Sequence, residues 1–286
     1  MPIDRRRLFG AAASLAVAGI ARADDDPVLA QIGALEERNG GRLGVAALDT
    51  GSRRRIAYRA GERFRMCSTF KILLVADVLA RIDRKIDSPD RWLTYEPSGL
   101  LPHSPVTEAH VGEGGMRLDQ LCAAAIEHSD NTSANLLLTV VGGPPAVTAY
   151  ARKLGDTVTR LDRTELELNR GAPDDPRDTT APAAIVGDME KVLLGGVLSP
   201  ESTQAMISWL IAATPGLNRI RKGVPADWHG GDKAGTGDTW TNDLAILWPP
   251  GRKPILVAAY FENSTASFDA REAALASVGR IVAASL

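Results

Sequence analysis

Ser68-Thr69-Phe70-Lys71 is the stretch of sequence that decides the fold, because two further fragments follow it along the chain. These fragments are Ser129-Asp130-Asn131 and Lys233-Ala234-Gly235, in that order. A Ser-x-x-Lys tetrapeptide alone is a short motif with a substantial false-positive risk. The ordered set of three fragments is far more specific, and it predicts one site assembled from distant parts of the chain.

The Ser-x-x-Lys spacing suits a serine nucleophile. The apolar run from Ile72 to Ala80 predicts a helix that begins near Ser68. Residues three apart share a helix face, so we expect the Lys71 amine to reach the Ser68 hydroxyl. A partly desolvated lysine can lose its proton near neutral pH and activate the serine, and the helix N-terminus offers N–H groups to an oxyanion. For the tetrapeptide alone, an ordinary helix start with a solvated lysine is the alternative.

From about residue 28 to its end, the chain resembles a class A β-lactamase, a serine enzyme of the penicillin-recognising superfamily. The most discriminating piece is Arg163-Thr164-Glu165-Leu166-Glu167-Leu168-Asn169. Within it, Glu165 and Asn169 match the pair that holds the hydrolytic water on the family's Ω-loop. Arg163 and Asp178 match the ion pair that closes this loop. A polar, proline-rich segment between them is typical of a compact functional loop.

The resemblance implies an α+β fold with two lobes and an active site in the cleft between them. Residues 24–60 and 211–286 are expected to form an antiparallel sheet flanked by the N- and C-terminal helices. Residues 61–210 are expected to form an inserted all-helical lobe, which includes the Ω-loop at residues 163–178.

Local patterns give a compatible layout. Residues 42–49 and 53–59 predict a hairpin around the turn Thr50-Gly51-Ser52. Residues 243–248 and 255–261 are β-like, and the alanine-rich segment 270–286 predicts a closing helix.

The resemblance also implies roles for residues of the second and third fragments. Ser129 would pass a proton to the leaving nitrogen, Asn131 would bind the substrate's side-chain amide, and Asp130 would be structural. A simple N-terminal cap of the following helix is the alternative for Ser129 and Asn131. Lys233 would supply positive charge for the substrate carboxylate, and the Thr236 N–H would be the second oxyanion donor.

Four further positions match the family pattern in some relatives alone or depart from it. Arg219 and Glu272 match a carboxylate-binding arginine and its acidic partner in some relatives, with a plain surface ion pair as the alternative. His103 stands where relatives carry an aromatic residue at the site mouth, and it either stacks on substrate or is an exposed loop residue. The clearest departure is Ala234, because relatives carry Thr or Ser there and their hydroxyl donates to the substrate carboxylate.

The first 23 residues have the features of an export signal. Arg5-Arg6-Arg7 precedes an apolar stretch, and Ala21-Arg22-Ala23 offers a cleavage site. Residues 4–9 resemble a twin-arginine signal, which implies export of a folded protein to the periplasm or medium of a bacterium, with a Sec leader as the alternative. No cysteine follows the apolar stretch, so no membrane anchor is expected after cleavage.

Cys67 and Cys122 are the two cysteines, and both would meet an oxidising compartment. Some relatives join the position of Cys67 to that of Gly237 by a disulfide, and others join the position of Cys122 to that of Val75. In this chain neither Gly237 nor Val75 can form such a bond. The resemblance therefore implies two buried free thiols, with a Cys67–Cys122 bond as the alternative.

Charge, aromatic content and histidine spacing exclude some classes of partner and cofactor. The net charge is −2 and aromatic residues make up 5% of the chain, so no nucleic-acid partner is expected. The four histidines show no metal-ligand spacing, and we expect no metal and no other cofactor.

The resemblance implies a hydrolase that opens the cyclic amide of penicillins and cephalosporins through a serine acyl-enzyme and so confers antibiotic resistance. Ser68 would attack, and either Lys71 or Glu165 through a water would take its proton. Glu165 would then activate the water that releases the acyl group. The expected partner is a small β-lactam substrate, and the expected protein is a monomer.

Two other functions share the serine and lysine motifs. A D-Ala-D-Ala carboxypeptidase or transpeptidase should lack the Glu165–Asn169 pair. A non-catalytic β-lactam sensor domain would normally be tethered to a membrane and would keep its acyl group.

Overall fold

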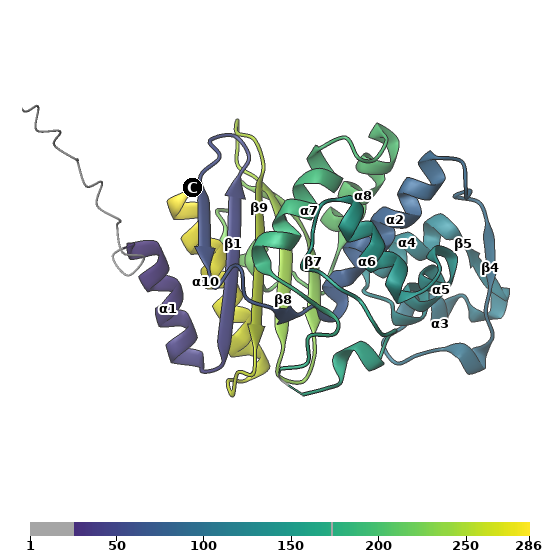
Figure 1. The fold of residues 1–286 in the computed structure, drawn as a ribbon, viewed down its shortest axis with the longest axis horizontal. Coiled ribbons are helices and arrows are strands. Elements are labelled where there is room, and N and C mark those ends of the chain that lie inside the picture. Colours follow the sequence, from purple (N-terminus) through teal and green to yellow (C-terminus); the bar gives the residue numbers. More distant parts are fainter. Residues whose placement is uncertain (1–25, 173) are drawn as a thin grey trace, which may run out of the picture.

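A five-stranded antiparallel sheet organises one of the two lobes in the computed structural model, which describes residues 26–172 and 174–286 (Figure 1). The predicted export signal lies outside these described residues. The strand order is β2-β1-β9-β8-β7, so both ends of the chain contribute to the sheet, as expected. The strands are β1 Arg42–Asp49, β2 Arg55–Tyr58, β7 His229–Thr236, β8 Thr241–Trp248 and β9 Ile255–Glu262.

The central strands β1, β8 and β9 are buried along nearly their whole length because both faces of the sheet are covered. In β1, Leu43 and Val45 pack into the core beneath the terminal helices, whereas Ala46 and Leu48 pack into the core on the opposite face. Successive strand residues point to opposite faces, so a strand buried on both sides needs an unbroken apolar run. The pairing Val45↔Ala259 then joins segments more than two hundred residues apart.

Helices from the two chain ends cover one face of the sheet, and a helix from mid-chain covers the other (Figure 1). The terminal helices are α1, Pro27–Asn39, and α10, Phe268–Ser285. The Asp26 side chain accepts a hydrogen bond from Val28 N and so caps α1. On the opposite face lies α7, Pro182–Leu194.

The second lobe is helical apart from one short two-stranded ribbon, β4 Trp92–Thr94 with β5 Gly115–Arg117. A second short pair, β3 Phe64–Arg65 with β6 Thr179–Thr180, connects the segment before Ser68 to the end of the Ω-loop. The division of the chain at residues 60 and 210 stays a prediction. The remaining helices and 3₁₀ turns are η2 Cys67–Phe70, α2 Lys71–Asp83, η3 Pro97–Gly99, α3 Pro105–Ala109, η4 Val111–Glu113, α4 Leu118–Glu127, α5 Asn131–Val141, α6 Pro144–Lys153, η5 Glu167–Asn169, α8 Pro200–Ala212 and α9 Ile220–Gly223.

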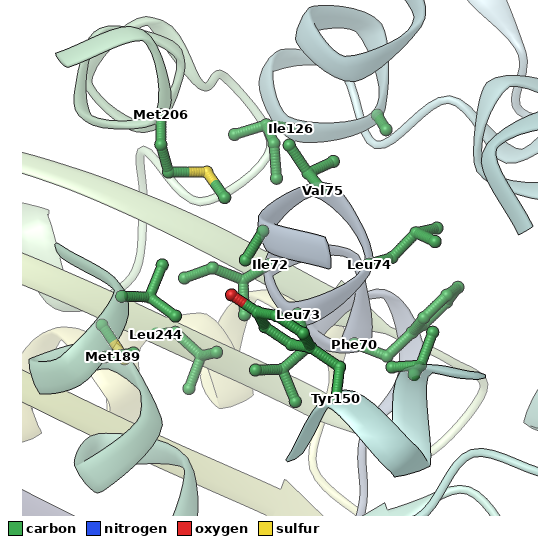
Figure 2. Packing of buried hydrophobic residues seen from close by; sticks show 14 of the residues in the cluster. Phe70, Ile72, Leu73, Leu74, Val75, Ile126, Tyr150, Met189, Met206 and Leu244 are labelled. Carbon is green, nitrogen blue, oxygen red and sulfur yellow. The ribbon is translucent and has the colours of Figure 1, made fainter. Parts of the chain in front are cut away.

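Helix α2 is the central helix of this lobe, and every residue from Lys71 to Leu79 is buried. In Figure 2 its side chains Leu73, Leu74 and Val75 point in different directions around the helix. A helix that is apolar on all sides is a core helix rather than a surface helix. Its packing therefore holds the N-terminal end, where Ser68 lies, in a fixed position. Among the described residues no helix is both long and apolar enough to cross a membrane.

The two cysteines are free and fully buried, which confirms the expectation of two unpaired thiols. Burial raises the pKa of the Cys67 thiol and of the Cys122 thiol well above the ordinary value. A buried thiol that stays protonated is a poor nucleophile.

We therefore expect no fast thiol reaction with Ellman's reagent in the native protein and two thiols per chain in denaturant without reductant. The Cys122→Ala variant, as a matched control, should give one thiol. A titration of zero in denaturant would instead reveal a Cys67–Cys122 bond and contradict the structure.

Candidate active site

Ser68 lies in the 3₁₀ turn that leads into α2, and strand β7 packs directly against this turn. A Cβ on Gly235 of β7 would lie 2.8 Å from Met66 O, so only glycine permits the observed approach. Cys67, just before the serine, has φ +47°, a left-handed conformation that is uncommon for a residue with a side chain. These two local features bring Thr236, the residue after Gly235, to the same cleft as Ser68.

Ser68 and Lys71 both contact one carboxylate oxygen of Glu165. Ser68 Oγ donates to Glu165 Oε1 at 3.1 Å, and Lys71 Nζ lies 3.1 Å from the same atom. No hydrogen bond joins Lys71 to Ser68 within the described chain, so the expected direct contact is wrong. The reason is that Lys71 Nζ is held by Asn131 Oδ1 and Ser129 O, both at 2.7 Å.

Burial sets the protonation of the two lysines. Lys71 is fully buried, and desolvation lowers its pKa, although the Glu165 charge opposes this effect. Desolvation and the neighbouring Lys71 charge lower the pKa of Lys233 well below its usual value. A lysine whose pKa is lowered can exchange protons near neutral pH and so act as a base or an acid.

The Ser129 hydroxyl lies between these two amines. Lys233 Nζ donates to Ser129 Oγ at 2.9 Å, and Lys71 Nζ lies 3.5 Å from the same oxygen. This arrangement can pass a proton from the nucleophile's side of the cleft to a leaving group.

Asp130, rather than Ser129 or Asn131, caps helix α5. Its buried carboxylate accepts from Ser133 N at 2.8 Å and from the backbone N–H groups of Val106 and Thr107 at 3.0 Å. The expected structural role of Asp130 is thus confirmed, and the capping interpretation of its two neighbours is wrong. Asn131 is the first residue of α5, and its side chain faces Lys71.

The Ω-loop presents Glu165 and Asn169 to the cleft. Asn169 Nδ2 donates to Glu165 Oε2 at 3.2 Å, while Asn169 Oδ1 is buried without a hydrogen-bond partner in the described part of the chain. The pair therefore has an acceptor available for a water molecule. The predicted ion pair at the base of the loop is confirmed, because Arg163 Nε lies 2.5 Å from Asp178 Oδ2.

Asn135 is a site residue that sequence reasoning missed. Its side chain accepts from Glu165 N at 3.0 Å and donates to Glu165 O at 2.8 Å, so it fixes the Glu165 backbone from helix α5. Asn135 lies four residues after Asn131 and therefore on the same helix face. A polar residue four positions after Asn131, within an otherwise apolar run, could have indicated that Asn135 faces the site.

Arg219 is an internal residue rather than part of a surface ion pair. Its side chain is 1% exposed and its Nε lies 3.1 Å from Glu272 Oε1. Arg219 Nη2 donates to Thr236 Oγ1 at 2.7 Å. Because the Thr236 oxygen accepts this bond, its hydroxyl hydrogen is free to donate to an anion in the cleft.

The predicted residues meet at one cleft of about 420 Å³. The buried side chains of Lys71, Glu165 and Lys233 lie beneath it and reach it through Ser68 and Ser129. No described residues form a group of three or more His, Cys, Asp or Glu side chains placed to hold a metal ion. The lining consists of Ser68, His103, Ser129, Asn131, Leu166, Asn169, Pro215, Arg219, Ala234, Thr236 and Phe268.

Phe268 and Pro215 are lining residues that the sequence did not single out. The Phe268 ring lies 5.8 Å from the Arg219 guanidinium and is 43% exposed. A single aromatic residue at the start of a helix has no spacing signal, so only the fold could place it here.

The site therefore combines a serine that contacts a carboxylate, an amide with a free acceptor and two lysines of lowered pKa. Such a combination is typical of an acyl-transferring hydrolase. A family model described as the beta-lactamase enzyme family matches residues 27–286. The chain is 44% identical over 249 residues to the carbapenem-hydrolyzing beta-lactamase KPC of Klebsiella oxytoca, which covers 86% of this chain and 85% of that protein. It is 47% identical to beta-lactamase L2 of Stenotrophomonas maltophilia, over 87% of this chain and 82% of that protein.

Solved structures give the same result. An ancestral class A beta-lactamase matches with a TM-score of 0.89 and 55% identity, over 91% of this chain and 100% of that one. A beta lactamase from Burkholderia vietnamiensis matches with a TM-score of 0.90 and 45% identity, over 92% of this chain and 98% of that one. The chain belongs to the class A β-lactamases.

Proposed function

We propose that Ser68 is the nucleophile with which this enzyme hydrolyses the β-lactam ring of antibiotics, the activity by which the family confers resistance. The observation that carries the proposal is the Glu165 carboxylate, one oxygen of which contacts Ser68 and the other Asn169. A single base is thereby placed to act on both the nucleophile and a water. A D-Ala-D-Ala carboxypeptidase or a sensor domain needs no such second contact.

In the acylation step, Ser68 Oγ attacks the lactam carbonyl carbon and the C–N bond breaks. The serine proton passes either to Glu165, directly or through a water, or to Lys71. Ser68 Oγ and Lys71 Nζ both lie next to Glu165 Oε1. Ser129 returns a proton to the leaving nitrogen, with Lys233 and Lys71 on either side. The Ser68 and Thr236 N–H groups stabilise the oxyanion, a contribution worth about 3–4 kcal/mol per donor.

In the deacylation step, Glu165 removes a proton from a water that Asn169 Oδ1 helps to hold. The resulting attack on the ester carbonyl releases the product and restores the Ser68 hydroxyl. General-base assistance of this kind contributes about 10²–10⁴-fold to rate.

Substrate binding uses the two ends of the cleft. Lys233 and the Thr236 hydroxyl, which Arg219 orients, receive the substrate carboxylate. Asn131 and Asn169 face the side-chain amide at the Ω-loop end, and His103 lies at the mouth. We further propose that residues 1–23 direct export to the bacterial periplasm or medium, by the twin-arginine route, and that the mature protein is a monomer.

Acid-quenching the enzyme within its first turnover of a cephalosporin, followed by peptide mapping, tests the assignment of the nucleophile. The acyl mass should lie on the peptide that contains Ser68 and should be missing from Ser68→Ala. An adduct on any other residue would overturn the assignment.

Ala234 gives a separate prediction about substrate affinity. It is 3% exposed and lines the cleft, but it has no hydroxyl for the substrate carboxylate. A hydrogen bond to a charged group is worth about 1.5–3 kcal/mol, or roughly 10- to 150-fold in kcat/KM if nothing replaces it. We expect Ala234→Thr to raise kcat/KM on penicillins or cephalosporins by less than this limit, because Thr236 already supplies a donor.

A double-mutant cycle of Ala234→Thr with Thr236→Ala measures this sharing. Thr236→Ala should reduce kcat/KM more in the natural enzyme than in the Ala234→Thr variant. Strictly additive effects would mean that the two side chains do not bind the same carboxylate.

A further inference from the structure

Arg65 is a buried arginine that the catalytic scheme does not use. It lies in the two-residue strand β3, three residues before the nucleophile, and is 4% exposed. Among the described residues, no carboxylate lies within 4.0 Å of its guanidinium. A buried guanidinium without an acidic partner must be satisfied by other acceptors.

These acceptors are backbone carbonyls of the Ω-loop. Arg65 Nη1 donates to Leu168 O at 3.2 Å and to Arg170 O at 2.8 Å, and Nη2 donates to Ala172 O at 3.1 Å. The first two carbonyls belong to the residues on either side of Asn169. Arg65 therefore binds the backbone that carries the water-binding amide.

The same guanidinium also lies against the turn between strands β7 and β8. It lies 5.0 Å from the ring centroid of Trp240, a residue of the turn that joins β7 to β8. The Trp240 ring packs on Gly237, where a Cβ would lie 2.4 Å from it, and Gly237 follows Thr236. Arg65 thus joins the segment around Asn169 to the segment that carries the second oxyanion donor.

We propose that Arg65 is a positioning residue for deacylation, which holds Asn169 against Glu165 so that the hydrolytic water is bound in line with the acyl group. This inference rests on the proposed function. Acylation needs Ser68 and its proton acceptor. Ser68 lies in the turn before α2 and Lys71 at the start of α2, and Asn135 holds the Glu165 backbone, so none of the three is held by the carbonyls of residues 168–172. Loss of Arg65 should therefore slow acyl release much more than acyl formation.

Arg65→Met removes the charge and all three hydrogen bonds while keeping an unbranched apolar side chain. Arg65→Lys restores an ammonium group that can reach part of the carbonyl set. Arg63→Met is the matched control, because the Arg63 side chain donates to Val158 O and Thr179 Oγ1 and donates no hydrogen bond to residues 168–172.

The decisive readout is the decay of the penicilloyl adduct, followed by intact mass after excess substrate is removed. We expect the adduct of Arg65→Met to persist about 10- to 100-fold longer than that of the natural enzyme, as for a misplaced catalytic group. Steady-state kcat and KM should fall together, because slow acyl release lowers both and leaves kcat/KM within a few-fold. Arg65→Lys should lie between the two, and Arg63→Met should match the natural enzyme.

A merely structural role gives a different result. It would lower the fraction of protein that forms an adduct, and kcat and kcat/KM would fall together at an unchanged KM. That outcome, or an adduct lifetime equal to the natural one, would overturn the inference. If the natural enzyme itself formed no adduct and showed no turnover, the proposed function would fail instead.

Discussion

Glu165→Ala is expected to convert the enzyme into a trap that holds a penicilloyl group on Ser68. The variant keeps the nucleophile, Lys71, Ser129 and the oxyanion donors, so acylation can proceed with Lys71 as base. It lacks the carboxylate that lies between Ser68 and Asn169, so water is not activated. Turnover should fall by at least about 10²–10⁴-fold, the contribution of a general base.

Intact mass spectrometry after addition of a penicillin measures this trap directly. The spectrum should show nearly full conversion to a one-to-one adduct that persists after substrate is removed. Glu167→Ala is the matched control, because Glu167 lies on the same loop but is 58% exposed, and within the described residues its one ion pair is with Arg170. Continued turnover of Glu165→Ala without an adduct would show that another group activates the water.

The buried carboxyl group of Asp188 is expected to make the free energy of unfolding fall as the pH rises, and Asp188→Asn is expected to remove this contribution. Asp188 lies on α7, is 1% exposed, and neither carboxylate oxygen has a hydrogen-bond donor among the described residues. Burial, followed by the charge of nearby Asp156, raises the pKa of Asp188 from 3.8 to about 9. At neutral pH the folded protein therefore keeps a proton on this carboxyl group.

The sign follows from proton counting. Between about pH 5 and pH 8 the unfolded chain has released this proton, because an ordinary Asp has a pKa of about 3.9, whereas the folded protein retains it. The free energy of unfolding must then fall as pH rises, by up to about 1.4 kcal/mol per pH unit from this group. An amide neither gains nor loses the proton, so the variant lacks this slope.

Urea unfolding of the natural protein and of Asp188→Asn at several values of pH in this window measures the difference. The exposed Asp90, with 75% of its side chain accessible, gives the control Asp90→Asn. Parallel curves for the natural protein and Asp188→Asn would show that Asp188 is already ionised in the folded state.

Secondary structure could be predicted from the sequence where a residue pattern repeats along one element. Residues 42–49 and the Thr50-Gly51-Ser52 turn predicted the β1–β2 hairpin, and the structure confirms it. The strand pairs β3–β6 and β4–β5 were not predicted, because strands of two or three residues are too short to show a period. The pairing of β1 with β9 on its other side also could not be predicted, because an apolar run contains no information about which strand it pairs with.

The candidate site was predictable wherever residues stand in a recognisable order. Ser68, Ser129, Lys233 and Glu165 are of this kind, and the structure brings them to one cleft. The contacts among them were less predictable, since Lys71 bonds Asn131 rather than Ser68. Arg65 gave no signal at all, because its partners are backbone carbonyls of a loop more than a hundred residues away.

Counting turnovers of a chromogenic cephalosporin per molecule of mature protein tests the central claim, that this site both acylates and deacylates. We expect linear hydrolysis far beyond one equivalent, and none by Ser68→Ala. A burst of one equivalent followed by a lasting adduct on the natural enzyme would contradict the account, because Glu165 and Asn169 would then not release the acyl group.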